Sequence, residues 1–117
     1  MANPNIAAAT SIIGDTYQSD LSTANSIYIT VPGNTVYKIN TISICNKTAS
    51  SITATVQPSF PPFAEKPIVQ DIDVPGNTTL VVVSKETSFY LPESGRIRAN
   101  VSASSSATIL ISYEAIS

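Results

Sequence analysis

The chain has 117 residues, of which 43% are hydrophobic and only 12% are charged, and its net charge is −2. This length suits one domain, and the charged share is about half of that in an average protein. The lysines and arginines are scattered and form no basic stripe, which excludes nucleic acid as an expected partner. The uncharged apolar stretches are too short to cross a bilayer, and no signal-peptide pattern opens the chain, so no membrane contact is expected.

The first ten residues differ in composition from the rest. Residues 1–10 are small, polar and uncharged, and their short alanine run is not continued by any helical pattern. They predict an extended N-terminal arm, which needs another surface in order to become ordered. The remaining residues, 11–117, are expected to form one domain.

Strand signals dominate that domain. Short runs of β-branched and aromatic residues alternate with period two and are separated by Gly, Pro, Asn and Ser. They predict strands at residues 11–19, 26–31, 36–45, 51–57, 68–74, 78–84, 89–91, 96–102 and 108–114. About eight strands at regular spacing, with no helix, predict an all-β fold: a single antiparallel β-sandwich, either Ig-like or jelly-roll-like.

One pentapeptide occurs twice. Val-Pro-Gly-Asn-Thr stands at residues 31–35 and again at 74–78, each time between two predicted strands. We expect two equivalent strand-to-strand corners, in which Gly33 and Gly76 adopt the left-handed position of a type II turn. Tyr28 and Tyr37, on either side of the first copy, are expected to be cross-strand partners.

Arg96 and Arg98 are the only two basic residues close together in the sequence. Alternation along a predicted strand places their side chains on one face. They can pair with carboxylates of a partner chain, or they can be solvated individually.

Residues with catalytic or metal-binding chemistry are scarce. The chain has no histidine and one cysteine, which excludes Ser-His and Cys-His nucleophiles, an internal disulfide and an all-cysteine metal site. Cys45 lies in an apolar run and is predicted to be buried. The tight acidic pair Asp71 and Asp73 suits half of a Ca²⁺ or glycosidase site, but edge-strand charges that prevent sheet pairing are the favoured interpretation. We therefore expect no enzyme, no catalytic residue, no cofactor and no metal.

Two segments resemble interaction surfaces. A proline-stiffened loop carries two phenylalanines, and such a rigid apolar group makes an anchor of low entropic cost; the alternative is that these rings cap an open end of the sandwich. The arm is the second segment. A surface with few charges is weakly protected against association, so we expect a homo-oligomer, with a trimer as the specific guess. The residues expected to contact partners are Pro4, Ile6, Phe60, Pro61, Pro62 and Phe63.

Two stretches resemble a known protein family. Residues 27–35 read Ile-Tyr-Ile-Thr-Val-Pro-Gly-Asn-Thr, and residues 39–46 read Ile-Asn-Thr-Ile-Ser-Ile-Cys-Asn. This pattern resembles small virion proteins of tailed phages, especially phages that infect cyanobacteria. A Ser/Thr/Ala turn with an alternating strand follows at residues 47–56, and an apolar strand closes the chain at 107–117. The likeness covers most of the chain after Ser22, while the proline-rich phenylalanine loop departs from it.

The resemblance implies a structural protein of the virion. It implies a capsid cement or decoration protein whose partners are the major capsid protein or other virion proteins. The alternative is a neck or tail accessory or fibre protein whose β-sandwich binds a receptor or glycan through its clustered loops. The shared positions carry strand and turn chemistry, so no functional residue is carried over.

Overall fold

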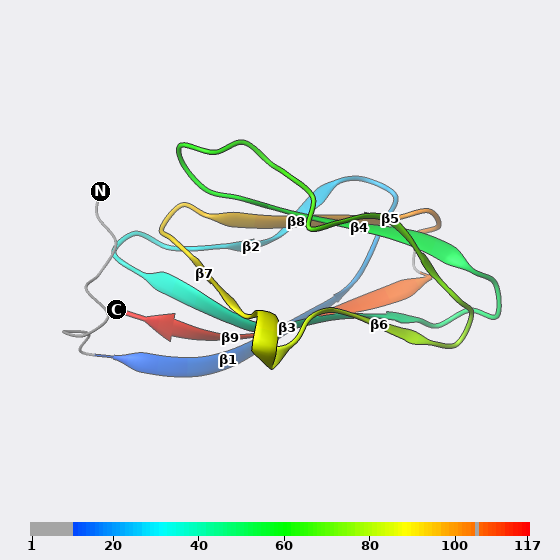
Figure 1. The fold of residues 1–117 in the computed structure, drawn as a ribbon, viewed down its shortest axis with the longest axis horizontal. Helices are drawn as coiled ribbons and strands as arrows, with labels where there is room; N and C mark the ends of the chain where they lie inside the picture. The colour runs from blue at the N-terminus through cyan, green and yellow to red at the C-terminus, as the bar shows by residue number, and fades with distance from the viewer. Residues whose placement is uncertain (1–10, 105) are drawn as a thin grey trace.

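The computed structural model describes residues 11–104 and 106–117, which form two antiparallel sheets packed face to face (Figure 1). Nine strands agree with the predicted ones to within two residues at each end, so the all-β sandwich is confirmed. The arm, with Pro4 and Ile6, lies outside the described residues. The strands are β1 (Ile12–Asp20), β2 (Ser26–Thr30), β3 (Val36–Asn46), β4 (Ile52–Ser59), β5 (Val69–Val74), β6 (Thr79–Val83), β7 (Phe89–Leu91), β8 (Arg96–Val101) and β9 (Ala107–Ile116).

The strand order identifies the sandwich as a jelly roll. One sheet runs β1-β9-β3-β6, with β7 also pairing β3, and the other runs β2-β8-β4-β5. The pairing is nested: the first strand pairs with the last, the second with the one before it, and β4 with β5. A long hairpin rolled up in this way is the jelly-roll arrangement. Strands β6 and β7 pair with successive parts of β3 and together take the place of one strand, and the 3₁₀ turn Lys85–Thr87 lies between them.

The core lies between the sheets and follows from the alternation of each strand. On β9 the inward residues are Ile109 and Ile111, and on the opposite sheet Val56 and Ile97 face them; all are buried completely. Burying one such side chain contributes about 1.5–3 kcal/mol. The residues that alternate with them, which are polar except for Leu110, lie on the two outer faces.

Cys45 is exposed, so the prediction that it is buried is wrong. The register between β3 and β9 shifts between Ile39 and Thr41, which changes the faces that odd and even residues occupy. Beyond the shift, Ile42 and Ile44 are buried. Cys45 follows Ile44 directly and therefore lies on the outer face, despite its apolar neighbours in the sequence.

Pro58 lies inside β4 and pairs with Ile97 of β8, although the strand predicted from the sequence ended at residue 57, before this proline. The backbone N–H of Ser102 donates to the Thr53 carbonyl, so the hydrogen bonds from β4 to β8 come from its odd-numbered residues. The backbone nitrogen of Pro58, which carries no hydrogen, therefore points away from β8. On that side the ladder with β5 has ended, and the N–H of Lys66 donates to the Pro58 carbonyl over 3.3 Å.

The repeated pentapeptide does form two equivalent corners. Residues 31–35 join β2 to β3, and residues 74–78 join β5 to β6, so both corners carry the chain from the same sheet to the other. They lie at opposite ends of the sandwich (Figure 1).

The left-handed residue in each corner is asparagine. Asn34 has a φ of 60° and Asn77 a φ of 57°, and no glycine in the described part of the chain has a positive φ. The left-handed positions predicted for Gly33 and Gly76 are therefore wrong by one residue. Asparagine tolerates this region because its short polar side chain bonds locally.

The tyrosines pair differently from the prediction, because the first corner separates β2 and β3 into different sheets. The ring of Tyr28 lies 6.5 Å from that of Tyr17, across the sandwich. The ring of Tyr37 stacks on that of Tyr113, with centroids 4.4 Å apart, and the Tyr113 hydroxyl donates to Asp15 over 3.3 Å. These rings fill the space between the sheets near the C-terminal end of β9.

We expect the ionisation of Tyr113 to lower the free energy of unfolding at alkaline pH. Burial raises its pKa to about 12, and Tyr37 and Asp15 add to the shift. An unfolded tyrosine ionises near pH 10, so between about pH 10 and 12 the folded state binds more protons and the free energy of unfolding falls as the pH rises. In Tyr113→Phe this fall should be smaller than in the parent, measured as the urea midpoint against pH. Parallel curves for the two proteins would contradict the assignment.

Candidate functional site

Four of the six predicted contact residues, Phe60, Pro61, Pro62 and Phe63, lie at the tip of the hairpin formed by β4 and β5. The N–H of Phe63 donates to the Phe60 carbonyl over 2.7 Å and closes a turn over Pro61 and Pro62, whose shared peptide bond is cis. Beyond the turn, the N–H of Ile68 donates to a carbonyl of β4. Proline fixes φ, so the tip is a short, stiff extension of a strand pair. We name residues 58–68 the hairpin tip.

The two phenylalanines of the hairpin tip have different roles. Their rings meet edge to face, with centroids 5.4 Å apart. Phe60 is half-buried and packs against the core, which is what a cap on the sandwich end does. Phe63 is 60% exposed. Phe60 thus fits the capping interpretation of this loop, and Phe63 is the ring that stays exposed, in contact with Phe60.

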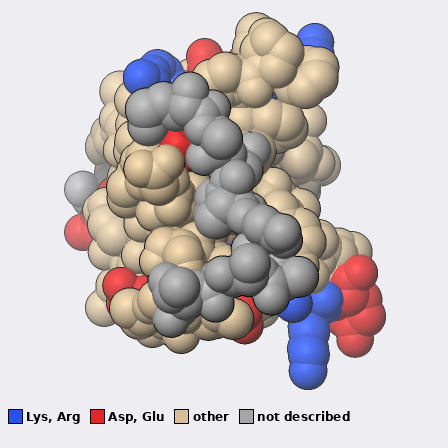
Figure 2. Space-filling model, turned by 90° about the vertical axis from the view of Figure 1, so that its left-hand side faces the viewer, with Lys and Arg blue, Asp and Glu red and all other residues tan. Residues whose placement is uncertain are grey.

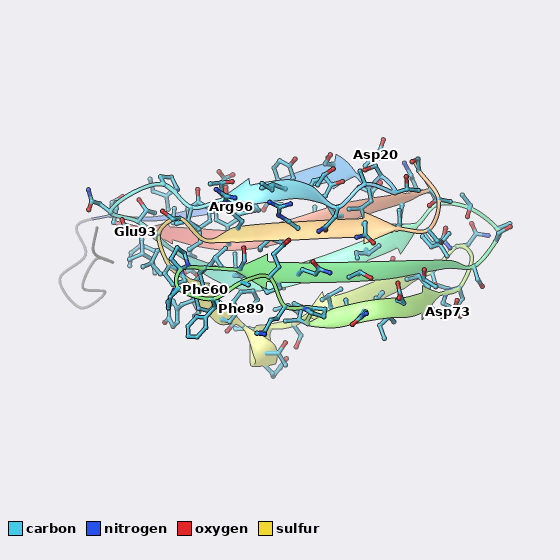
Figure 3. The ribbon with its side chains drawn as sticks, turned by 90° about the horizontal axis from the view of Figure 1, so that it is seen from above. Asp20, Phe60, Asp73, Phe89, Glu93 and Arg96 are labelled. Atoms are coloured by element: carbon cyan, nitrogen blue, oxygen red, sulfur yellow. The ribbon has the colours of Figure 1, made fainter. Side chains whose placement is uncertain are left out.

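An open hollow of about 440 Å³ lies against the hairpin tip. Residues 60–64 form one wall, and Ser59, Ser94 and Arg96 form the rest. Figure 3 shows Phe60, Glu93 and Arg96 toward the same end of the sandwich, where Arg96 is the first residue of β8. A ligand in the hollow would therefore contact both the apolar rings and one cation.

Arg96 and Arg98 share the outer face of β8, as predicted, because Ile97 between them is buried. Their surroundings differ. The Nε of Arg98 lies 3.0 Å from a carboxylate oxygen of Glu65, which ties the hairpin tip to the sheet. Among the described residues, no carboxylate pairs with Arg96. Arg96 is therefore the cation left available at the hollow.

A second surface is notable for its lack of charge. On the outer face of the β1-β9-β3-β6 sheet, the central positions hold hydroxyl, amide, thiol and aliphatic side chains, and we name this surface the neutral face. Its members are Thr16, Gln18, Thr41, Ser43, Cys45, Thr79, Val81, Thr108, Leu110 and Ser112. In the end-on view of Figure 2 the described charged side chains likewise form small separate groups on an uncharged surface.

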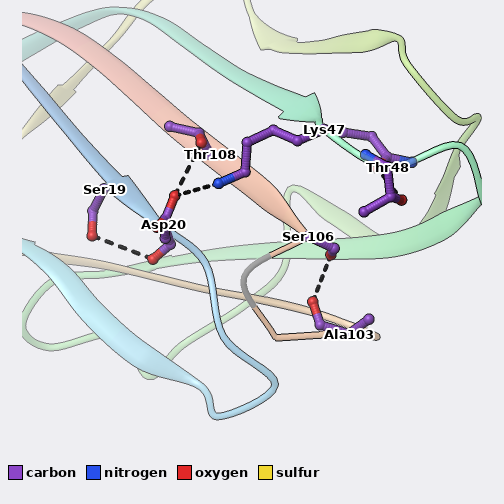
Figure 4. Close-up of polar contacts among 8 residues, drawn as sticks. Ser19, Asp20, Lys47, Thr48, Ala103, Ser106 and Thr108 are labelled. Carbon is purple, nitrogen blue, oxygen red and sulfur yellow. Dashed lines mark hydrogen bonds and ion pairs between the residues drawn. The ribbon is translucent and has the colours of Figure 1, made fainter.

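Charges border the neutral face at one end of β1. The Nζ of Lys47 lies 2.7 Å from Asp20, and the Thr108 hydroxyl donates to the same carboxylate over 3.2 Å (Figure 4). The hydrogen bond from Lys47 and then that from Thr108 lower the pKa of the Asp20 carboxyl. The group is fully exposed, so this pair marks the border of the face and is worth little stability.

The acidic pair lies on β5, an outer strand of its sheet, as the favoured interpretation expects. Asp71 has a φ of 48°, and its N–H donates to the Thr55 hydroxyl over 3.0 Å, where the ladder between β4 and β5 shifts register. Within residues 11–104 and 106–117, no three acidic, cysteine or histidine side chains come together as metal ligands. The same residues include no helix long and apolar enough to cross a membrane.

Sequence reasoning missed two polar side chains that hold the corners. Asn46 is 1% exposed; its amide nitrogen donates to the carbonyls of Ser50, Val74 and Pro75, and its oxygen accepts from Thr48. The signal for it was present, because Asn followed by Lys-Thr suits an Asx turn.

Glu93 has the corresponding position at the other corner. It is 8% exposed, and its carboxylate accepts the N–H of Asn34 over 2.7 Å. The backbone groups of Val31 also bond to the Ser94 N–H and the Gly95 carbonyl. No signal in the sequence connects positions so far apart.

Comparison with known proteins adds no identity. No protein-family model, no curated protein and no solved structure matches the chain.

Proposed function

We propose that this chain is a structural protein of a tailed-phage virion, a capsid cement or decoration protein that acts as a homo-oligomer through contacts with the major capsid protein or other virion proteins. The observation that carries the proposal is Phe63, presented at 60% exposure on the stiff hairpin tip. The sequence resemblance supports it, as does the jelly roll, a fold that capsid domains use. That second support is an analogy of fold alone.

The two surfaces suit different parts of such a contact. An aromatic ring held in one conformation loses little entropy when it enters a partner's pocket, and its burial contributes about 1.5–3 kcal/mol. The neutral face can pack against protein without stripping water from charges, whose burial is costly. A part that is repeated over a shell gains from both, because each copy adds the same contacts.

Phe60→Ala with Phe63→Ala should reduce binding to capsids from which the protein has been stripped. Loss of the exposed ring and of the ring that supports it is expected to raise the dissociation constant at least tenfold, measured by cosedimentation. Tyr90→Ala is the matched control, since Tyr90 is 51% exposed and lies on β7, in the sheet opposite to the one that carries the hairpin tip. Equal binding by all three proteins would exclude the hairpin tip as the contact. Deletion of residues 1–10, assayed alongside, tests the contact expected from the arm.

The alternative function is a receptor- or glycan-binding module of a neck, tail or fibre. The hollow favours it, because Arg96, which no described carboxylate pairs with, lies beside phenylalanine rings and suits an acidic sugar, and lectin domains also use the jelly roll. Binding of the purified protein to a glycan array, abolished by Arg96→Gln and retained by Arg98→Gln, would support this function. If the protein also failed to bind stripped capsids, the cement proposal would be replaced.

A further inference from the structure

Strand β1 is the exposed edge of its sheet and is unusual among the outer strands. Among the described residues it pairs with β9 alone, through nine consecutive residues with no shift of register. The ladders of the outer strands β2, β5 and β6 all shift register, and β7 has three residues. Bulges and short lengths protect sheet edges from pairing, as do proline and lysine, and β1 contains neither residue. It is therefore the long, regular edge of this molecule.

The hydrogen bonds to β9 show which backbone groups this edge presents. Ser11 and Ser117 exchange both of their hydrogen bonds, at 3.0 and 2.9 Å, and the N–H of Leu21 donates to the Ala107 carbonyl. In an antiparallel ladder such pairs alternate, so odd-numbered residues of β1 bond to β9. The N–H and C=O groups directed to the free edge belong to the even-numbered residues Ile12, Gly14, Thr16, Gln18 and Asp20.

We propose that β1 pairs antiparallel with β1 of a second copy, about a twofold axis at Thr16, and joins two sheets into one. This register places Ile12 opposite Asp20 of the second copy, and Gly14 opposite Gln18. Every hydrogen-bonded pair then consists of even-numbered residues, which are the ones whose N–H and C=O groups point away from β9. All nine residues of the strand take part.

Charge and apolar exposure favour this register over the two registers that place the twofold axis at Asp15 or at Tyr17. A twofold axis at Asp15 would set two carboxylates directly opposite each other, which is destabilising. An axis at Tyr17 would leave Ile12 and Ile13 unpaired, although they are 61% and 60% exposed. With the axis at Thr16, Asp20 faces Ile12 and its charge is already balanced by Lys47.

Asp15 opposes the pairing within each copy. Its carboxylate accepts the N–H of Thr16 over 2.8 Å, which occupies the central donor of the free edge. That N–H must be released before it can bond to a neighbouring strand. Asp15→Ala removes both the competing acceptor and the charge, so this variant should associate more tightly than the parent.

The test is the mass of the full chain by sedimentation equilibrium. The parent should reach twice its 12.3 kDa. Thr16→Lys sets like charges opposite each other at the axis, and it should raise the dissociation constant at least tenfold. Thr79→Lys is the control: Thr79 is exposed on the same outer face, at the β6 edge, and its variant should dimerise like the parent.

Gly14→Pro checks the backbone itself. Nothing lies within 4 Å of a Cβ at Gly14, and its N–H faces the free edge, so proline removes a donor from the proposed contact and none from the ladder with β9. It should weaken the dimer as Thr16→Lys does, with unchanged circular dichroism. If the Gly14→Pro variant does not fold, the dissociation constants of Thr16→Lys and Asp15→Ala decide whether β1 forms the dimer contact. A parent that stays monomeric, a trimer, or a dimer that neither Thr16→Lys nor Gly14→Pro weakens would overturn the proposal. A monomer would also contradict the homo-oligomer of the proposed function, whereas binding to stripped capsids is measured separately and can succeed or fail independently.

Discussion

Asn46→Asp should lower the free energy of unfolding by about 3–5 kcal/mol, a large share of the 5–15 kcal/mol typical of a domain. The Asn46 amide nitrogen donates over 2.8, 3.0 and 3.2 Å to three backbone carbonyls, from the turn after β3 and from the corner after β5. Aspartate has nearly the same shape but has no donor when ionised. It would place an unpaired charge against three carbonyl oxygens at a site that is 1% exposed.

The pH dependence separates this cause from a simple loss of packing. Burial raises the pKa of an acid, so the substituted carboxyl binds its proton more tightly in the folded state than in the unfolded one, where it ionises near pH 3.9. The loss of stability should therefore be smallest below about pH 4 and grow as the pH rises. Urea denaturation at several pH values measures it.

Asn100→Asp is the matched control for this change. Its amide makes one long hydrogen bond, 3.4 Å, to Asn25 on an outer face, and Arg98 lies two residues away on the same face of β8. A surface change of this kind stays within about 0.5 kcal/mol. If Asn46→Asp and Asn100→Asp had equal stability at neutral pH, Asn46 would not hold the corner.

The strands could be predicted because the core demands period-two alternation over each of them. The same alternation predicted the wrong face for a side chain where one extra residue in a strand interrupts the period of two. The bulge in β3 decided that Cys45 points outward, and its position depends on pairing with β9, far away in the sequence. Pro58 entered β4 because its missing N–H faces away from β8, which again depends on which neighbour lies on which side.

The candidate site was predictable only in its composition. Phenylalanines among prolines predicted a stiff apolar loop, and the loop is a hairpin tip with Phe63 exposed. The surroundings of Arg96 and Arg98 could not be predicted from the sequence. Glu65 pairs with Arg98, and no described carboxylate pairs with Arg96, because the hairpin tip lies alongside β8, a consequence of three-dimensional packing.

Gly76→Ala is expected to cost about 1–3 kcal/mol, the usual range for forcing extra atoms into a packed site, or more. The predicted reason, a left-handed φ, does not apply, because Asn77 takes that conformation. The reason is close approach: a Cβ on Gly76 would collide with the main-chain carbonyl of Ala49 and lie 3.0 Å from its Cα. Main chain cannot rotate away, so the second corner would have to move off the turn after β3.

Three variants identify that cause. Gly14→Ala should lose little or no stability, because nothing lies within 4 Å of the added atom. Gly76→Asn should be as damaging as Gly76→Ala, whereas a left-handed glycine would tolerate asparagine better than alanine. Ala49→Gly should fail to rescue Gly76→Ala, since the collision is with the backbone of residue 49 and not with its methyl group. Rescue by Ala49→Gly, or a stable Gly76→Asn, measured by urea denaturation, would show that the corner and the turn do not meet in the way the structure places them.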